Sequence, residues 1–360
     1  IITINKTVIN VFLLNHIKKL SQKFQINFIS PIKSNELVLD DVKYQNNFVN
    51  LNRSLSLINF LRNLKDISII LRKKDIDLII SLHPKNGLLI SISKLFFKFK
   101  NLHIITGQIW ADKKNIKKFF LKYLDKFILY KSSHLLIDSN SQISFLKKEG
   151  FNTKKIKCIC NGSISGIDVN NFYKSETNKR KFCIENSINI EAKIILFLGR
   201  VNDYKGIHLL LDAFKVVIDR NYSCNLLVIG DDEIDFKSKI KKLEPKYRNK
   251  IIILGHKKNI NYYYSISSIF CLPSFREGFG MSVIEASSSY LPVVVSNIYG
   301  LKDSCIDKQT GLKFQKGNLF DLANKIIILL NDPIKSLELG RNGRNFVKKK
   351  FDQKDVTNFM

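Results

Sequence analysis

Two glutamates, Glu277 and Glu285, lie eight positions apart around the glycine-containing segment Gly278-Phe279-Gly280. If a helix begins near Gly280, Glu285 lies about one and a half turns into it and Glu277 lies on the loop before it. Both carboxylates can then face one pocket and accept hydrogen bonds from the vicinal hydroxyls of a ribose or a hexose. On spacing alone, a plain helix start with an acidic residue placed favourably for the helix dipole is the better explanation.

The same helix start predicts an anion site. The backbone N–H groups of Gly280, Met281 and Ser282 would have no partner inside the helix and would point at an anion such as a diphosphate. The two glycines let the backbone come close to a ligand. The segment is not a dinucleotide-binding fingerprint, because the third glycine is absent.

Two cations, Arg200 and Lys205, lie in another predicted strand-to-helix loop. Arg200 directly follows Gly199 at the end of an apolar run, and Lys205 directly precedes Gly206. This pair suits a diphosphate group, since arginine binds phosphate in bidentate fashion and lysine acts as a point charge. The alternative, in a chain this basic, is two solvated surface cations.

The elements that must position these residues are short apolar runs alternating with helical patterns, which is typical of parallel α/β layers. Predicted strands in the first half are 26–30, 78–81, 103–106 and 135–138, with helical patterns at 8–20, 54–74 and 113–133. In the second half the predicted strands are 193–199, 226–230, 251–254, 268–272 and 293–296, and the helices are 206–219, 232–243, 259–265, 280–289, 319–330 and 334–349. Two such units predict a cleft between the carboxyl ends of two parallel sheets, where open α/β sheets bind ligands.

The length of 360 residues is comfortable for two domains, and 45% hydrophobic residues can supply their cores. No apolar run approaches the roughly 20 residues that span a bilayer. We expect no signal peptide, and the apolar start without Met suggests that the first strand begins upstream. The six cysteines and six histidines form no ligand pattern, so we expect reduced thiols and no metal.

The formal charge of +28 is concentrated in residues 1–160, where 28 Lys and Arg stand against 10 Asp and Glu. A composition rich in Lys, Asn and Ile is one explanation, because it is typical of AT-rich coding bias. A nucleic-acid surface and an anionic membrane surface or substrate are the others. In residues 113–133 and 94–100 lysines alternate with Phe and Leu. Such a helix can lie on an anionic membrane, or pack its apolar face on the core and leave its outer face solvated.

Three segments resemble retaining glycosyltransferases of family 4: Gly199-Arg200-Val201 with Lys205-Gly206, the E-x7-E element Glu277 to Glu285, and 161–168. Segments 103–110 and 296–301 are similar to a bacterial subgroup that builds surface polysaccharides and lipid-linked oligosaccharides. The resemblance covers nearly the whole chain. It implies the GT-B fold, in which two Rossmann-like parallel-sheet domains face each other across a cleft.

The resemblance also implies roles for individual residues. Arg200 and Lys205 would neutralise the donor diphosphate, Glu285 would bind the ribose, and Glu277 would hold hydroxyls of the transferred sugar. Backbone N–H groups at Gly280, Met281 and Ser282 would complete the phosphate site. His103 would lie near the reaction centre, or else cap a strand-end loop. Gly255 and His256 would line the nucleobase pocket, or else form polar surface.

The expected domains are an acceptor-binding domain over 1–165, a linker over 166–190 at a turn cluster and polar stretch, and a nucleotide-sugar-binding domain over 191–345. A C-terminal helix over 346–360 can return toward the first domain. One segment departs from the family pattern, because Asn5-Lys6-Thr7 lacks the usual glycines of the loop after the first strand. Thr7 could instead be a helix N-cap.

The expected activity is transfer of a hexose or N-acetylhexosamine from a nucleotide diphosphate sugar, UDP-linked in our expectation, to a polyprenyl-diphosphate-linked glycan. The family retains anomeric configuration, and we expect no metal and no cofactor. The enzyme would be cytoplasmic and peripheral at the membrane. A basic nucleic-acid-binding protein is the first alternative, but it leaves Glu277 and Glu285 unexplained. A catalytically silent GT-B scaffold is the second, and the intact set of Arg200, Lys205 and both glutamates argues against it.

Overall fold

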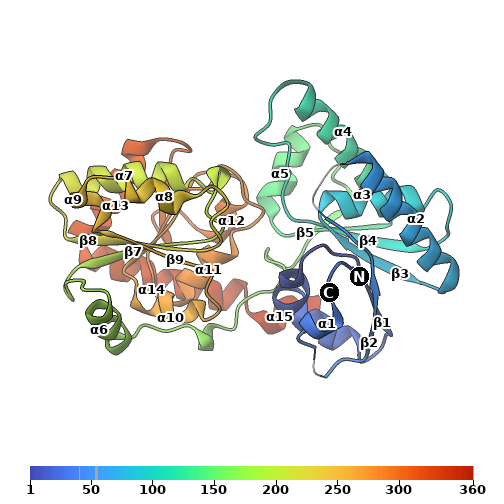
Figure 1. Ribbon diagram of the computed structural model, residues 1–360, viewed down its shortest axis with the longest axis horizontal. Coiled ribbons are helices and arrows are strands. Elements are labelled where there is room, and N and C mark those ends of the chain that lie inside the picture. The colour runs from blue at the N-terminus through green and yellow to red at the C-terminus, as the bar shows by residue number, and fades with distance from the viewer. Residues whose placement is uncertain (40, 53–55, 360) are drawn as a thin grey trace. The chain divides into compact units, whose positions relative to one another are not determined.

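The structure, a computed structural model, describes residues 1–39, 41–52 and 56–359 and divides into two compact units (Figure 1). Unit 1 comprises Ile1–Gly166 together with the residues from Gln353 onward, and unit 2 comprises Ile167–Asp352. Each unit is a parallel sheet packed between helices. The predicted α/β class is confirmed.

The described residues of unit 1 form six parallel strands: β1 (Ile26–Ser30), β2 (Tyr44–Phe48), β3 (Leu78–Leu82), β4 (Lys100–Ile105), β5 (His134–Ile137) and β6 (Ile156–Cys158). They form the pairs β1-β2 and β3-β4-β5-β6. Ile2 makes parallel bridges with Ile29 and with Ser81, so it connects the two groups. All six strands therefore run in one direction and end at one edge.

The helices of unit 1 lie on both sides of these strands (Figure 1). They are α1 (Leu14–Leu20), α2 (Leu57–Lys73), α3 (Pro84–Ser93), α4 (Asn115–Lys131), α5 (Asn140–Lys148) and α15 (Gln353–Phe359). Helix α3 packs against α2 and α4, while α15 packs against α1. The first residues of the helical pattern predicted at 54–74 lie outside the described residues.

The helix predicted at 8–20 is divided into a π-helical turn, Val8–Phe12, and α1. Thr7 does not cap it, which corrects the expectation. The backbone of Thr7 is already helical (φ −59°, ψ −32°), so its hydroxyl cannot turn back onto the first N–H groups. Asn5 fills that place instead, since its side-chain oxygen accepts the Thr7 N–H at 2.9 Å.

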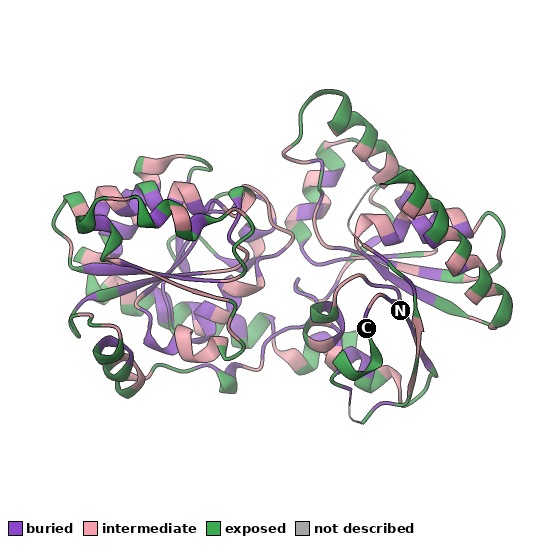
Figure 2. Cartoon of the chain, viewed as in Figure 1, coloured by how far each residue is buried: buried purple, intermediate pink, exposed green. Residues whose placement is uncertain are grey.

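Unit 2 contains β7 (Lys193–Leu198), β8 (Cys224–Ile229), β9 (Ile251–Gly255), β10 (Ile269–Leu272), β11 (Val293–Ser296) and β12 (Gly311–Phe314). Their order in the sheet is β12-β11-β10-β7-β8-β9, and every pair is parallel. The central strands β7, β8, β10 and β11 are buried on both faces, which explains why they read as continuous apolar runs (Figure 2). The chain first builds outward from β7 to β9 and then restarts at β10 on the other side of β7, so the topological switch point lies between β7 and β10.

The helices of unit 2 are α6 (Glu176–Glu185), α7 (Ile207–Asp219), α8 (Phe236–Lys241), α9 (Pro245–Arg248), α10 (Ile260–Ile266), α11 (Met281–Ser288), α12 (Leu301–Ser304), α13 (Leu319–Asn331) and α14 (Pro333–Lys350). Figure 1 shows α7, α8 and α13 over one face of the sheet and α10, α11 and α14 over the other. Five of them, α7, α10, α11, α13 and α14, agree with the predicted helices to within two residues at each end, whereas α8 begins four residues later than predicted and α6 lies in the segment predicted as a linker.

The predicted linker over 166–190 is instead part of unit 2 from Ile167 onward. Within it, α6 packs on α10, and Phe182 lies 6.5 Å from the rings of both Tyr262 and Tyr263. The polar residues that suggested a linker form the exposed side of this helix, while Phe182 and Cys183 are buried.

The predicted boundary at 345/346 falls inside α14, which continues to Lys350. The chain leaves unit 2 only after Asp352, and the following α15 belongs to unit 1. There Val356 is fully buried in the unit 1 core, and Lys19 Nζ donates to Asn358 Oδ1 at 2.7 Å. The C-terminal segment, expected over 346–360 to return toward the first domain, belongs to unit 1 from Gln353 onward.

Candidate functional site

The carboxyl ends of β7 and β10 bring together two residues that are far apart in sequence. Ile195 and Leu196 of β7 pair with Ile269 and Phe270 of β10, so the loops that follow these strands are neighbours. Lys205 Nζ donates to Glu277 Oε1 across the two loops. The side chains are only 17% and 12% exposed. The structure thus brings Lys205 and Glu277 together at the switch point, where open α/β sheets bind ligands.

The loop after β7 is shaped by Asn202 and Gly206. The Asn202 side chain accepts the Lys205 N–H at 3.1 Å and donates to Glu233 Oε2 at 2.7 Å. Gly206 has φ +76°, and a Cβ there would lie 2.1 Å from the carbonyl oxygen of Pro273. Because only glycine allows this approach, the β7 loop lies directly against the end of β10, and Lys205 reaches Glu277.

The loop after β10 is held at both sides of Glu277. Ser274 Oγ donates to Glu277 Oε1 at 2.9 Å, and the Phe275 N–H donates to the carbonyl of Tyr204 at 2.8 Å. Gly300 supports the loop from outside, since a Cβ there would lie 2.6 Å from the Glu277 carbonyl oxygen. The carboxylate is therefore placed by backbone packing as well as by its ion pair.

Helix α11 begins directly after this loop, as the sequence predicted. Gly280 occupies the N-cap position with φ +84°, and Met281 and Ser282 form the first turn. The N–H groups of such a first turn point along the helix axis away from the helix body. The structure thus places the predicted anion-binding backbone next to the Lys205–Glu277 pair.

Glu285 lies in α11, just beyond the first turn of the helix, whereas Glu277 lies on the loop before it. Its Oε2 accepts the hydroxyl of Tyr264 at 2.8 Å, and that hydroxyl also approaches the Ser282 carbonyl at 3.3 Å. Burial raises the pKa of Glu285, and the hydrogen bond from Tyr264 opposes this rise. Tyr264 itself is fully buried. The sequence analysis missed it, and its only signal was a Tyr-rich helix in which one hydroxyl would need a buried partner.

Arg200 is held by two neighbours that the sequence analysis did not select. Its guanidinium pairs with Glu233 at 3.2 Å and lies 5.1 Å from the ring centroid of Tyr204. The guanidinium of Arg276 lies 5.1 Å from the same ring. Two arginines on one tyrosine add positive charge beside Lys205. No pattern in the sequence links Tyr204 or Glu233 to Arg200 and Arg276.

Gly255 and His256, predicted at the nucleobase pocket, lie at the end of β9, at the edge of the sheet. The Gly255 carbonyl accepts the Gly230 N–H at 2.9 Å, and His256 Nδ1 lies 3.6 Å from Asp231 Oδ1. His256 and Asp231 are 68% and 66% exposed. They form an open polar rim on the β8–β9 side of the switch point.

His103 is not where the sequence analysis expected it. It lies inside β4, which continues to Ile105, and its side chain is 4% exposed. Its Nδ1 bonds to Ser81 Oγ at 2.9 Å, and a Cβ on Gly87 would lie 2.6 Å from its Cε1. Burial, together with the charge of His83, lowers the pKa of His103 to about 4. In the described structure His103 is a neutral packing residue between β4 and α3, because a glycine leaves room for its ring.

A second histidine, His83, lies at the carboxyl end of β3 and was missed. It occupies the N-cap position of α3, before Pro84, with φ +69° and ψ +142°. A positive φ at a residue with a side chain costs on the order of 1–3 kcal/mol, and such residues cluster at active sites. Cys160 and Ser163, at the end of β6, also have positive φ. The signal in the sequence that could have identified His83 was a His-Pro pair directly after an apolar run.

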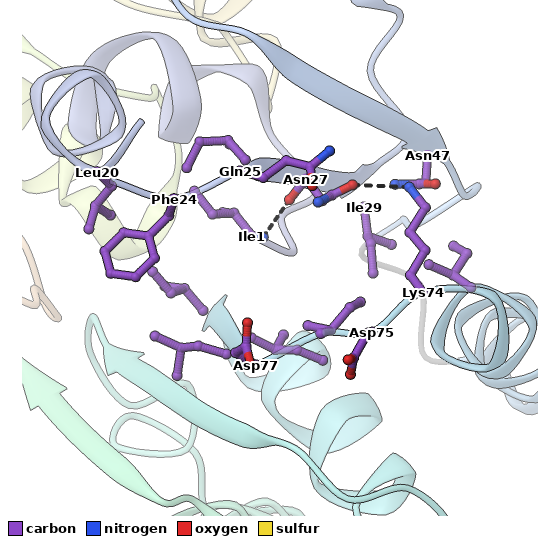
Figure 3. Close-up of a pocket in the computed structure, with 16 residues that line it drawn as sticks. Ile1, Leu20, Phe24, Gln25, Asn27, Ile29, Asn47, Lys74, Asp75 and Asp77 are labelled. Atoms are coloured by element: carbon purple, nitrogen blue, oxygen red, sulfur yellow. Dashed lines mark hydrogen bonds between the residues drawn. The ribbon is translucent and has the colours of Figure 1, made fainter. Parts of the chain in front are cut away.

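A cavity of about 230 Å³ lies at the opposite edge of the unit 1 sheet (Figure 3). Its lining includes the starts of β1 and β3, and Lys74 donates to Asn27 Oδ1 at 3.0 Å within it. Ligands of parallel sheets bind at the carboxyl ends of the strands. We therefore do not place the functional site in this cavity.

Within the described residues, no three His, Cys, Asp or Glu side chains come together in a way that could hold a metal ion. All six cysteines lie in the described part of the chain as free thiols, and four are buried. Burial raises the pKa of Cys224 and of Cys305 to about 12, so both are protonated at neutral pH.

Comparison of the sequence and comparison of the structure with known proteins both find glycosyltransferases. Residues 178–346 match the family described as glycosyl transferases group 1. The chain is 28% identical over 286 residues to the capsular polysaccharide biosynthesis glycosyltransferase CapM of Staphylococcus aureus, covering 76% of this chain and 72% of CapM. It is 28% identical over 243 residues to an N,N'-diacetylbacillosaminyl-diphospho-undecaprenol alpha-1,3-N-acetylgalactosaminyltransferase of Campylobacter jejuni, covering 66% and 62%.

Among solved structures, HepE of Anabaena in complex with UDP and glucose is similar, with a TM-score of 0.81, 15% identity, and 99% and 96% of the two chains covered. A glycosyltransferase of Rickettsia africae has a TM-score of 0.78 and 22% identity, with 99% and 94% covered. At these identities the likeness concerns the fold.

Proposed function

We propose that this chain, which has the GT-B fold, is a glycosyltransferase of polysaccharide biosynthesis that transfers a hexose or N-acetylhexosamine from a nucleotide diphosphate sugar to a glycan acceptor. We further propose that transfer retains the anomeric configuration. The observation that carries the proposal is the Lys205–Glu277 pair at the switch point of unit 2.

Glu277 is suited to hold the transferred sugar. Among the described residues, Lys205 and Ser274 both donate to its Oε1. Its Oε2 is thereby left to accept hydrogen bonds from sugar hydroxyls, which a carboxylate binds strongly. Since the loop is fixed by Gly300 and by the Tyr204–Phe275 backbone bond, this acceptor is positioned before the donor arrives.

The positive charge next to Glu277 is suited to the donor diphosphate. Lys205, Arg200 and the first turn of α11 all lie around the ends of β7 and β10. Fixed cations and oriented N–H groups stabilise the charge that develops on the leaving diphosphate. We propose that these groups supply what a metal ion supplies in other transferases, so that the reaction needs neither metal nor cofactor.

Glu285 is suited to the ribose hydroxyls, because Tyr264 fixes one of its oxygens from the protein interior. The rim at Gly255 and His256 is then the place for the base. HepE has been solved with UDP and with UDP-glucose, and we propose uridine as the base for this chain as well.

The proposed reaction breaks the bond between the anomeric carbon and the diphosphate oxygen. The acceptor hydroxyl attacks the same face of the sugar, and its proton passes to the departing phosphate oxygen. The protein contributes charge stabilisation and positioning rather than a nucleophile. In this scheme Glu277 and Glu285 bind hydroxyls, and neither acts as an acid or base.

For the acceptor we propose a glycan on a polyprenyl diphosphate, bound by unit 1, as the name of the Campylobacter relative suggests. The carboxyl edge of the unit 1 sheet, with His83 and Ser163, would be its binding region. Among the described residues no helix is long and apolar enough to cross a membrane. Because a polyprenyl-linked acceptor is held in a membrane, we propose a peripheral location at the cytoplasmic membrane face. The comparisons do not favour the nucleic-acid alternative, although they leave the basic charge to be explained.

A screen of nucleotide sugars for thermal stabilisation, followed by mass spectrometry of products on lipid-linked acceptors, tests the proposal. We expect one donor to stabilise the protein and to be consumed, with activity persisting in excess chelator. Glu277→Ala should abolish transfer, whereas Lys325→Ala, which removes a surface ion pair with Asp321 on α13, should not. Wild-type turnover in Glu277→Ala would contradict the site, and loss in chelator restored by Mn²⁺ would contradict metal independence.

A further inference from the structure

Helix α4 presents an apolar face to solvent. Five of its large side chains are at least 60% exposed: Ile116, Phe119, Phe120, Tyr123 and Tyr130. The opposite face of the same helix already packs on unit 1, where Ile128 is buried and α3 is the neighbour. The helix therefore has two apolar faces, and only one is needed for the fold (Figure 2).

The exposed residues form one continuous stripe. At 100° per residue they fall within an arc of about 100°, and the stripe from Ile116 to Tyr130 is about 21 Å long. The rings of Phe119 and Tyr123 lie 5.7 Å apart. This arrangement overturns the simpler interpretation of the sequence, in which the aromatic face of residues 113–133 would pack on the core and leave a plain solvated surface.

Lysines flank the stripe on both sides. On the helical wheel Lys117 and Lys131 lie on one side and Lys122 and Lys126 on the other. Residues 113–131 contain seven lysines and one acidic residue, Asp125. The carboxyl of Asp125 is turned inward and accepts the Trp110 indole N–H at 2.7 Å. Lys118 and Lys122 pair with Glu149 at 3.4 and 2.7 Å, so the outward positive charge is carried mainly by the exposed Lys114, Lys117 and Lys126.

The surface continues onto the turn after α3. Lys94 Nζ donates to the Lys131 carbonyl at 2.8 Å, which places this turn beside the end of α4. Leu95 and Phe96 follow directly and are 55% and 73% exposed. Lys98 and Lys100 are exposed in the same segment. The turn thus adds apolar and basic residues of the same kinds.

The face is held rigidly in place. Trp110, which is 1% exposed, stacks at 5.5 Å on both Phe145 and Phe151 and anchors α4 through Asp125. On the α3 side, Gly87 allows contact with Ile128 of α4. A rigid apolar stripe loses little conformational entropy on docking.

We propose that the outer face of α4, together with Leu95 and Phe96, docks unit 1 on an anionic lipid bilayer. Exposed aromatic and aliphatic residues partition into the headgroup boundary, and flanking lysines pair with anionic headgroups. A protein partner fits less well, because lysine is depleted at protein interfaces. Ile116 and Leu95 also favour lipid over nucleic acid, since aliphatic side chains do not stack on bases.

Co-sedimentation of the full chain with vesicles tests this proposal without donor or acceptor, so its outcome is independent of the transferase activity. We expect binding to vesicles of phosphatidylglycerol and phosphatidylcholine, weakening with salt, and little binding to phosphatidylcholine alone. Lys117→Gln with Lys126→Gln should weaken binding roughly 25-fold, since each basic residue near an anionic surface contributes about fivefold. Phe119→Ser with Phe120→Ser should weaken it at least tenfold.

Ile334→Ser with Leu337→Ser is the matched control, because these residues are 80% and 60% exposed on α14 of unit 2. It should bind vesicles like the wild type, and all variants should unfold at the wild-type temperature. Absence of vesicle binding at low salt, or equal losses in the control, would overturn the proposal. So would binding of single-stranded DNA, or self-association, that depends on Phe119 and Phe120 while vesicles are not bound.

Discussion

Lys205 and Glu277 should be coupled in stability as well as in function, and a double-variant cycle measures this coupling. Lys205→Met keeps most of the side-chain volume and removes the charge, while Glu277→Gln keeps the shape of the carboxyl group. Each single variant leaves one charge without its partner in a region that is 17% or 12% exposed. The double variant removes both charges.

The expected size follows from the position of the pair. Opposite charges about 4 Å apart attract by roughly 4 kcal/mol at an effective dielectric constant near 20. Desolvation of both groups offsets part of this attraction, so we expect a coupling free energy of about 2 kcal/mol. For a domain the size of unit 2, this corresponds to roughly 4–8 °C in unfolding temperature.

The assay is calorimetric unfolding of the wild type, both single variants and the double variant, with transfer measured on the same preparations. We expect the double variant to be more stable than the sum of the single effects predicts, by the coupling free energy. Transfer should be lost in all three variants, because sugar and diphosphate contacts do not return when stability does. Additive stability losses would refute the paired geometry, and recovery of transfer in the double variant would refute the assigned roles.

Three further predictions concern the surroundings of the site and of α4. Tyr264→Phe removes the hydrogen bond that opposes the raised pKa of Glu285, so the acidic limb of the pH profile for donor kcat/KM should move to higher pH; an unchanged profile would contradict the role of Glu285. Burial raises the pKa of Asp125 to about 6 from its usual 3.8. The folded state then binds this proton more tightly than the unfolded state, and the free energy of unfolding should fall as pH rises from about 4 to about 6. Asp125→Asn should therefore gain stability relative to the wild type by up to about 3 kcal/mol between pH 4 and pH 7, measured by denaturant unfolding; a difference independent of pH would refute this. Gly206→Ala places a Cβ 2.1 Å from the Pro273 carbonyl oxygen, so it should lower the unfolding temperature and abolish donor stabilisation, whereas Gly150→Ala, with open space around the Cβ position, should leave donor stabilisation unchanged.

The predicted elements were most accurate where strands are central in their sheets. β7, β8 and β10 are buried on both faces, so they appear in the sequence as apolar runs that need no other signal. The strands missed were β2, β6 and β12, which all lie at sheet edges. β2 reads Tyr-Gln-Asn-Asn-Phe, because an edge strand with a partly solvated face does not need a continuous apolar sequence.

The site was predictable as far as its residues carry local signals. A cation, a carboxylate or a glycine in a strand-to-helix loop is visible in the sequence, and this identified Arg200, Lys205, Gly280 and Glu277. Tyr264 and Glu233 were not visible, because their roles depend on contacts with residues 21 and 33 positions away. His103 was misjudged because nothing local reveals that Gly87 opens a space for its ring.

By itself the sequence determined the α/β class, the central strands and the pair of loops that carry charge, since burial and loop chemistry act over a few neighbouring residues. Only the tertiary structure decided that β7 and β10 are adjacent. This adjacency brings Lys205 to Glu277. It also decided that the aromatic stripe of α4 faces solvent, because whether an amphipathic face is covered depends on which other element reaches it. Strand order and helix cover are set by packing across the whole unit, and no local pattern encodes them.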